Sequence, residues 1–176
     1  ARMTAGEFPD GGPVLRAKID MASPNINLRD PVLYRIKHME HARTKNSWCV
    51  YPTYDYAHPF CDVAEGIALS LCTLEFEDHR PLYDWVCEHA APAFPGNARH
   101  KPVELEISRL EITNGLTSKR RINALVTEGK VEGWDDPRLL TLDALARRGF
   151  PPKVLFKFIE DCGIGRSNGE LPFSRL

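Results

Sequence analysis

The sequence predicts an α/β protein in which strands and helices mix up to about residue 128 and helices follow. Over residues 103–107, apolar side chains alternate with glutamates, which is typical of a half-buried strand. Near Thr141 and Pro151, capping and proline signals instead indicate the starts of helices. These two periodicities favour the α/β class over an all-helical or all-strand chain.

Four elements are expected in the first part of the chain. Residues 14–19 are rich in extended formers and predict a short strand. An Asp-Pro pair is a helix start, so we expect a helix over about 30–41. Residues 48–51 predict a short buried strand. Apolar residues spaced four apart predict a helix over 62–72, in which Gly66 is tolerated at some cost.

The remaining helices are marked by their ends. Thr141 is an N-cap, Pro151 and Pro152 open a helix, and Gly163 follows its last residue. Together with apolar periodicity, such signals predict helices over residues 79–91, 118–128, 141–148 and 151–162. The last fifty residues are therefore expected to be all-helical.

Composition excludes several classes of protein. The 176 residues carry 23 Lys and Arg against 24 Asp and Glu, so bulk charge favours neither a nucleic acid nor an acidic substrate. Five scattered cysteines without a CxxC pair argue against a disulfide framework and against a protein-bound metal. No apolar run is long enough to span a bilayer, so we expect no membrane partner and a cytoplasmic protein.

A basic loop is the most specific local signal. Residues 116–121, Leu-Thr-Ser-Lys-Arg-Arg, follow a Gly-containing turn and precede a predicted helix. A hydroxyl, exposed backbone N–H groups and an ammonium suit the binding of phosphates. By itself the spacing leaves a solvated basic turn as the alternative interpretation.

A second cluster follows the strand predicted at 48–51. Tyr54, Asp55, Tyr56 and His58 place phenols, a carboxylate and an imidazole at a strand end, where open α/β sheets bind ligands. The alternative is an aromatic turn that packs between strand and helix, with His58 satisfied by the backbone. Cys72, further along, suits core packing by default.

Taken in order, several runs resemble the glutaminyl-tRNA synthetase family of class I aminoacyl-tRNA synthetases. The resemblance covers residues 14 to about 165, and it rests on the runs LRAKIDM (15–21), RDPVLYRI (29–36), YPTYD (51–55), EGI (65–67), SLCTLEF (70–76), SRL (108–110) and GWDDPR (133–138). In that light residues 116–120 take the place of the KMSKS signature. The resemblance implies an enzyme that uses ATP, with Mg²⁺, to join glutamine to tRNA through a glutaminyl adenylate.

The resemblance also implies roles for single residues. Ser118 and Lys119 are the expected catalytic residues, acting on the ATP phosphates. The glutamine pocket is expected to include Tyr54, His58 and Cys72. The further ATP contacts are expected from Thr73, Arg109, Leu110 and Thr117. The tRNA contacts are expected from Gly165, Arg166, Ser167, Asn168, Gly169 and Glu170, with Arg147, Arg148, Lys153 and Lys157 as candidate phosphate contacts.

The identity of residue 72, a cysteine, favours glutamine over glutamate as the substrate amino acid. The related glutamyl enzymes have an Arg at this position, which would pair with a substrate carboxylate, whereas a neutral amide needs no dedicated cation. Two departures from the family pattern stand out: Thr117 replaces the signature's Met, and Glu104 stands where the family often has Gln. A glutamyl or relaxed Glu/Gln enzyme and a non-catalytic tRNA-binding paralogue are the alternative functions.

By the resemblance, the chain divides into three segments. Residues 1–45 are expected to be the tail of an acceptor-binding insertion, 46–128 the second half of a Rossmann-like domain, and 129–176 a helical stem-contact segment. The HIGH-type motif that precedes this part in the family is not among the 176 residues. We therefore expect the isolated chain to be inactive and to self-associate through exposed strand edges.

Overall fold

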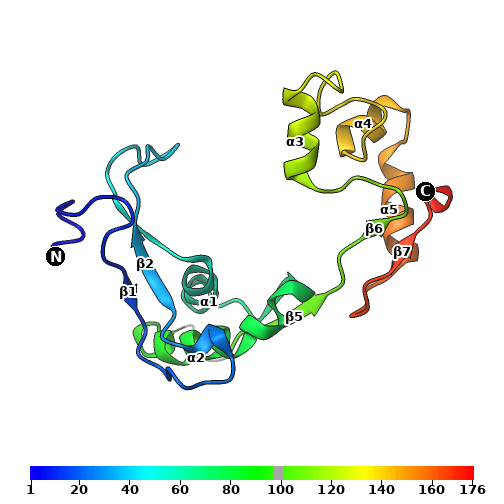
Figure 1. Ribbon diagram of the computed structural model, residues 1–176. Helices are drawn as coiled ribbons and strands as arrows, with labels where there is room; N and C mark the ends of the chain where they lie inside the picture. Colours follow the sequence, from blue (N-terminus) through cyan, green and yellow to red (C-terminus); the bar gives the residue numbers. More distant parts are fainter. Residues whose placement is uncertain (97–100) are drawn as a thin grey trace. The chain divides into compact units, whose positions relative to one another are not determined.

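A computed structural model describes residues 1–96 and 101–176. The chain divides into two compact units, Ala1–Glu106 and Ile107–Leu176, and Figure 1 shows their elements. Both helices and strands are present, so the predicted α/β content is confirmed. In the described part of the chain, no helix is long and apolar enough to cross a bilayer.

The first unit opens with a three-stranded antiparallel sheet. Its order is β1 (Leu15–Arg16), β2 (Val32–Ile36) and β3 (Val50–Pro52), and Tyr34 of β2 faces Pro52 of β3. The strand predicted at 14–19 is confirmed only over two residues. The one predicted at 48–51 starts two residues later, and its prediction as buried is wrong, because its residues are half-buried or exposed. The helix predicted from Asp30 to about His41 is wrong, because β2 occupies that stretch.

Asp30 explains why the helix does not form. Its backbone has a φ of 44°, in the left-handed region, and its Oδ1 accepts the amide of Ile19 at 2.8 Å instead of capping a following turn. The guanidinium of Arg16 donates to the Asp30 carbonyl at 2.9 Å, and the Ala17 amide donates to the Pro31 carbonyl at 2.9 Å. These long-range bonds direct the chain into the sheet.

A second helix prediction is wrong for a different reason. Helix α1 (Tyr54–Glu65) begins eight residues before the predicted start, and it ends where Gly66 adopts a φ of 69° and caps it. A residue with positive φ after the last turn is a common helix end, and glycine reaches that conformation at little steric cost. Strand β4 (Leu69–Thr73) then replaces the second half of the predicted helix.

The second part of the first unit packs α1 against α2 (Arg80–Ala90). Strand β5 (Val103–Ile107) pairs with β4, and the short 3-10 helices η1 (Ile26–Leu28), η2 (Leu74–His79) and η3 (Ala91–Ala93) complete the unit. The helix predicted at 79–91 and the strand at 103–107 are confirmed. Val63, Tyr83, Cys87 and Ala90 form the apolar core between the two helices.

The β4–β5 pair turns its polar face inward. Glu104 and Glu106 are buried, while the alternate residues Val103 and Leu105 of β5 and Leu69 and Leu71 of β4 are exposed. This is the reverse of the usual arrangement for an alternating strand with one face to solvent. Of the inward carboxylates, Glu104 lines the pocket described below. The expected self-association of the chain stays a prediction.

The second unit is mainly helical. It contains α3 (Lys119–Thr127), α4 (Leu142–Arg147) and α5 (Pro152–Cys162), each at a predicted position, and the Thr141 side chain accepts the Ala144 amide at 3.0 Å. Ile122, Leu139 and Ala144 form its core. The expectation that the last fifty residues are all-helical is wrong, because β7 (Glu170–Leu171) pairs in parallel with β6 (Glu111–Ile112), ahead of the final turn η4 (Phe173–Arg175).

Asp136 holds together the turn that precedes α4. Its buried carboxylate accepts the backbone amides of Glu132 and Arg138, each at 3.0 Å, and two guanidinium N–H groups of Arg138 at 2.8 and 2.7 Å. The hydrogen bonds from Arg138, followed by those from the backbone, hold the pKa of Asp136 well below the ordinary value of 3.8. A single carboxylate therefore accepts four hydrogen bonds within this turn.

We expect Asp136→Asn to destabilise the chain at neutral pH, because the amide cannot accept all four bonds. The folded-state pKa lies below the unfolded value, so the carboxylate stabilises the fold above pH 3.8 and this stabilisation is lost as the pH falls through the folded-state pKa. Urea unfolding at several pH values measures the difference between the variant and the wild type. A difference that stays constant from pH 7 down to the acid limit would contradict this account.

Candidate amino-acid and phosphate sites

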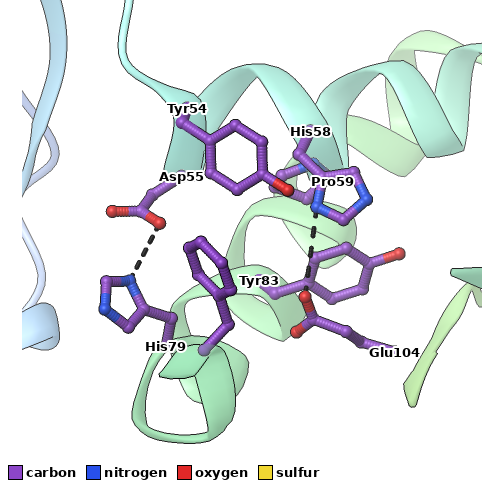
Figure 2. A pocket seen from close by; sticks show the side chains of 8 residues that line it. Tyr54, Asp55, His58, Pro59, His79, Tyr83 and Glu104 are labelled. Carbon is purple, nitrogen blue, oxygen red and sulfur yellow. Dashed lines mark hydrogen bonds and ion pairs between the residues drawn. The ribbon is translucent and has the colours of Figure 1, made fainter. Parts of the chain in front are cut away.

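The first helix turn of α1 builds one side of a small pocket. Figure 2 shows the residues around it, which come from α1, η2, α2 and β5. Tyr54, His58 and Asp62 are four residues apart and therefore share one face of the helix. The pocket is lined by Tyr54, Asp55, His58, Pro59, Phe76, His79, Tyr83 and Glu104.

Aromatic rings surround the imidazole of His58. The Tyr54 ring stacks on it with 5.4 Å between centroids, and the Tyr83 ring lies at 5.4 Å in a tilted arrangement. Phe76 packs against Tyr54 at 5.3 Å. Tyr54 is 56% exposed, so this ring forms the solvent-facing side of the group.

His58 lies between two carboxylates. Its Nε2 is 3.2 Å from Oδ2 of Asp62, and its Nδ1 is 4.0 Å from Oε1 of Glu104, the contact drawn in Figure 2. The interpretation that the backbone satisfies His58 is therefore not what the structure shows. The i,i+4 spacing of His58 and Asp62 is a signal that sequence reasoning missed.

Glu104 is the least satisfied polar group of the site. Its side chain is 4% exposed, and its Oε2 has no hydrogen-bond partner among the described residues. Burial raises the pKa of Glu104, while the Cys72 thiol and the charge of His58 oppose that rise. Burial, followed by Glu104, also raises the pKa of Cys72 to about 12, so that its thiol is a neutral group at physiological pH.

Two further ion pairs lie in the same unit, one of them in the pocket lining. Arg80 of α2 forms a bidentate ion pair with the fully buried Glu106, and the distance from its Nε to Oε1 is 2.5 Å. His79 lies 2.9 Å from Asp55 through Nδ1, closing the pocket on the side of η2. Both pairs join residues more than twenty positions apart, and no local pattern in the sequence indicates them.

The pocket is nearly closed. Its cavity volume is about 10 Å³, which is close to the space that one water molecule needs. A larger polar group can enter only if a lining side chain moves. The exposed Tyr54 is the lining residue with the most freedom to do so.

The predicted phosphate loop lies in the second unit. Ser118 is the N-cap residue of α3, and Thr117, Ser118 and Lys119 are all exposed. Leu116, at the first position of the signature, packs against the core around Ile122. A Cβ on Gly115 would lie 2.9 Å from the backbone carbonyl oxygen of Ile112 and 2.3 Å from Cδ1 of Leu140. Because the Ile112 backbone cannot move aside as a side-chain end can, glycine is favoured where the chain enters the loop.

The other predicted contacts are divided between the two units. Thr73 ends β4 in the first unit, whereas Arg109, paired with Glu111 at 3.1 Å, and Leu110 belong to the second. The Gly165 carbonyl accepts the Ser108 amide at 2.7 Å, and the predicted tRNA-contact run ends at Glu170, in β7.

Several basic residues near that run have partners within the chain. Arg147 pairs with Glu132 at 3.0 Å, Lys157 pairs with Asp161, and Arg148 stacks over Phe173 at 4.5 Å. Among the described residues, no group of three or more His, Cys, Asp or Glu side chains is arranged to hold a metal ion.

Comparison with known proteins assigns the chain to a family. A family model described as tRNA synthetases class I (E and Q), catalytic domain, matches residues 1–171. The chain therefore belongs to the class I tRNA synthetase catalytic-domain family of the E and Q type.

Three relatives are named glutamine–tRNA ligase. Over 99% of the chain, it is 56% identical to the glutamine–tRNA ligase of Bradyrhizobium diazoefficiens, 54% identical to that of Xanthomonas campestris and 52% identical to that of Xylella fastidiosa. It covers 30%, 32% and 32% of these relatives, so it spans about a third of their length.

The Arg80–Glu106 pair offers a test of the site's electrostatics. We expect Arg80→Ala to destabilise the chain by about 3 kcal/mol, because the change leaves the charge of Glu106 buried without its main partner. Lys101→Ala is the matched control: Lys101 pairs with Asp84 and Glu88 on the surface, so its loss should cost less than about 1 kcal/mol. Chemical denaturation measures both, and equal losses would contradict the importance of the buried pair.

Proposed function

We propose that the protein that carries this chain joins glutamine to its tRNA. Glutamine and ATP first give glutaminyl adenylate: an oxygen of the amino-acid carboxylate attacks the α-phosphorus and pyrophosphate leaves. A hydroxyl at the 3′ end of the tRNA then attacks the activated carbonyl and AMP leaves. The names of the relatives support this proposal, and the pocket supports the choice of amino acid.

The observation that carries the choice of glutamine is the charge of the pocket lining. It contains a buried carboxylate, Glu104, and neither Lys nor Arg. A substrate carboxylate would meet the negative charge of Glu104 in a poorly solvated place, whereas an amide can donate to it. Tyr54 and His58 supply groups that can donate or accept, and the neutral Cys72 thiol adds no cation.

Substrate entry requires the pocket to open. A glutamine side chain is far larger than the present cavity, so we infer that Tyr54 moves away from His58 and Phe76 when glutamine binds. Two tilted or stacked ring contacts are worth about 1–3 kcal/mol together, which binding energy can offset.

The phosphates of ATP are assigned to the second unit in this proposal. Lys119 follows the charge that moves onto pyrophosphate, Ser118 and the adjacent backbone contact the phosphates, and Mg²⁺ accompanies ATP as part of the substrate. Thr117, Arg109 and Leu110, with Thr73 from the first unit, are proposed as further ATP contacts. The exposed run from Gly165 to Glu170 is proposed to contact the tRNA backbone.

We expect ATP–pyrophosphate exchange that depends on glutamine and not on glutamate, from a polypeptide that carries this chain within the length of its relatives. Lys119→Ala should lower the exchange rate by about 100-fold or more, because it removes a cation that acts on the transition state. Arg121→Ala, a change to an exposed cation two residues further along, is the matched control and should lower it less than about threefold.

The outcomes separate the alternative functions. Equal exchange with both amino acids would indicate a relaxed Glu/Gln enzyme, and exchange with glutamate alone a glutamyl enzyme. No exchange with either amino acid, with tRNA present, would indicate a non-catalytic tRNA-binding protein.

A further inference from the structure

An exposed arginine of the second unit lies against two aromatic rings. The guanidinium carbon of Arg148, the C-cap residue of α4, lies 4.5 Å from the ring centre of Phe173 in η4 and 5.3 Å from that of Phe150. The two rings meet edge to face, with 6.0 Å between their centres. A cation over aromatic rings is attracted to them, so this arginine–aromatic cluster (Arg148, Phe150 and Phe173) joins the end of the chain to the link between α4 and α5.

The cluster lies two residues beyond β7, the partner strand of β6 (Figure 1). Hydrogen bonds on both sides extend the pairing of these short strands. The Ser108 amide donates to the Gly165 carbonyl at 2.7 Å, and the Thr113 amide donates to the Leu171 carbonyl at 2.9 Å. Residues 108–113 are thus held along the segment that ends in the cluster.

Charge does not favour the pairing of β6 with β7. Glu111 lies directly opposite Glu170, and like charges at paired positions destabilise neighbouring strands. Arg109, 3.1 Å from Glu111, offsets part of this repulsion. In the described part of the chain, β6 pairs with no other strand. A two-residue pairing of this kind therefore needs support from outside the strands, and the arginine–aromatic cluster is in place to supply it.

β6 leads directly into the proposed phosphate loop (residues 116–119). The Gly115 amide donates to the carbonyl of Ile112, the last residue of β6, at 2.8 Å. Leu116 then packs in the core, and Ser118 caps α3. A displacement of Ile112 would therefore move the start of the loop.

We propose that Arg148 is a positioning residue for the phosphate loop: through Phe150 and Phe173 it holds the end of the chain in place, and this keeps β7 paired with β6 at the base of the loop. Arg148 acts at a distance and contacts no phosphate in this role, which differs from the sequence-based expectation of a contact with tRNA. The inference rests on the proposed function, because it takes ATP as the ligand of the loop.

The kinetic test uses ATP–pyrophosphate exchange by the polypeptide that carries this chain, with tRNA present. We expect Arg148→Ala to raise KM for ATP about fivefold, because a loosely held β6 leaves the loop poorly placed. KM for glutamine should change less than about twofold, since the pocket proposed for glutamine belongs to the first unit.

Arg175→Ala is the matched control. It removes an exposed cation from η4 itself and leaves the rings of the cluster in place, so KM for ATP should stay within about twofold of the wild type. Equal rises in both variants would overturn the inference. So would a raised KM for tRNA with an unchanged KM for ATP in Arg148→Ala, which would indicate a tRNA contact.

Changes at Phe173 test whether the ring itself matters. Phe173→Tyr keeps a ring under the guanidinium and should behave like the wild type, whereas Phe173→Leu keeps only an apolar side chain and should match Arg148→Ala. The double variant of Arg148→Ala and Phe173→Leu should be no worse than either single variant, because both remove one contact. Additive losses would contradict a shared role.

Hydrogen–deuterium exchange tests the positioning without any activity. In the same polypeptide, we expect Arg148→Ala to speed amide exchange at Ser108 and Thr113 about fivefold, because their acceptors lie in the segment that the cluster holds. The amides of α3 are the internal reference and should keep the wild-type rate. Faster exchange in both regions would indicate a general loss of stability, and unchanged exchange at Ser108 and Thr113 would show no link; either result would overturn the inference. Phe173→Leu provides the same measurement where Arg148→Ala fails to fold.

The two measurements separate this inference from the proposed function. Faster amide exchange at Ser108 and Thr113, in a protein whose wild type catalyses no glutamine-dependent pyrophosphate exchange, would overturn the proposed function and leave the structural role of Arg148 standing. Glutamine-dependent pyrophosphate exchange with an unchanged KM for ATP in Arg148→Ala would overturn the inference alone.

Discussion

The packing of the first unit depends on the hydrogen-bond donors that its buried carboxylates need. Asp62, Glu104 and Glu106 are buried, and an unpaired charge in such a place is costly. Asp62 of α1 accepts hydrogen bonds from Ser70 of β4 and Tyr83 of α2. Glu106 of β5 accepts hydrogen bonds from Arg80 of α2. The packing of α1, α2, β4 and β5 thus involves these carboxylates as well as the apolar core.

Glu104 differs from the other two carboxylates because one of its oxygens lacks a partner among the described residues. A buried acceptor left unsatisfied costs about 1–3 kcal/mol, and such groups are rare unless they have a function. Glu104 lies beside His58 and Tyr54 in the pocket. Under the proposed function, the amide of the substrate would donate the hydrogen bond that this carboxylate lacks. The Glu104 carboxylate would then lower the stability of the fold and favour an amide side chain over an acidic one in the substrate.

Under the proposed function, the two units have separate roles. The first holds the pocket proposed for the amino acid, whose polar lining residues come from several elements. The second presents the loop proposed for the phosphates as an exposed stretch. Leu116 anchors it in the core, and Gly115 lies close to the Ile112 carbonyl and Leu140. Fixed groups suit the selection of a small side chain, and an exposed basic loop suits a large, charged and transient partner such as a polyphosphate.

The sequence by itself determined the elements whose signals are local. Thr141, Pro152 and Gly163 mark the ends of α4 and α5 because capping involves only residues within one helical turn, and the SKRR loop and the Tyr54–His58 cluster could be selected as candidates from side-chain chemistry alone. Tertiary structure decided the rest. Asp30 accepts a hydrogen bond from the Ile19 amide rather than capping a helix, and the glutamates of β5 face inward. Both outcomes depend on partners that lie far from these residues in the chain. A residue cannot indicate a donor that only folding brings to it, and for this reason Ser70 and Tyr83, the donors to Asp62, emerged only from the structure.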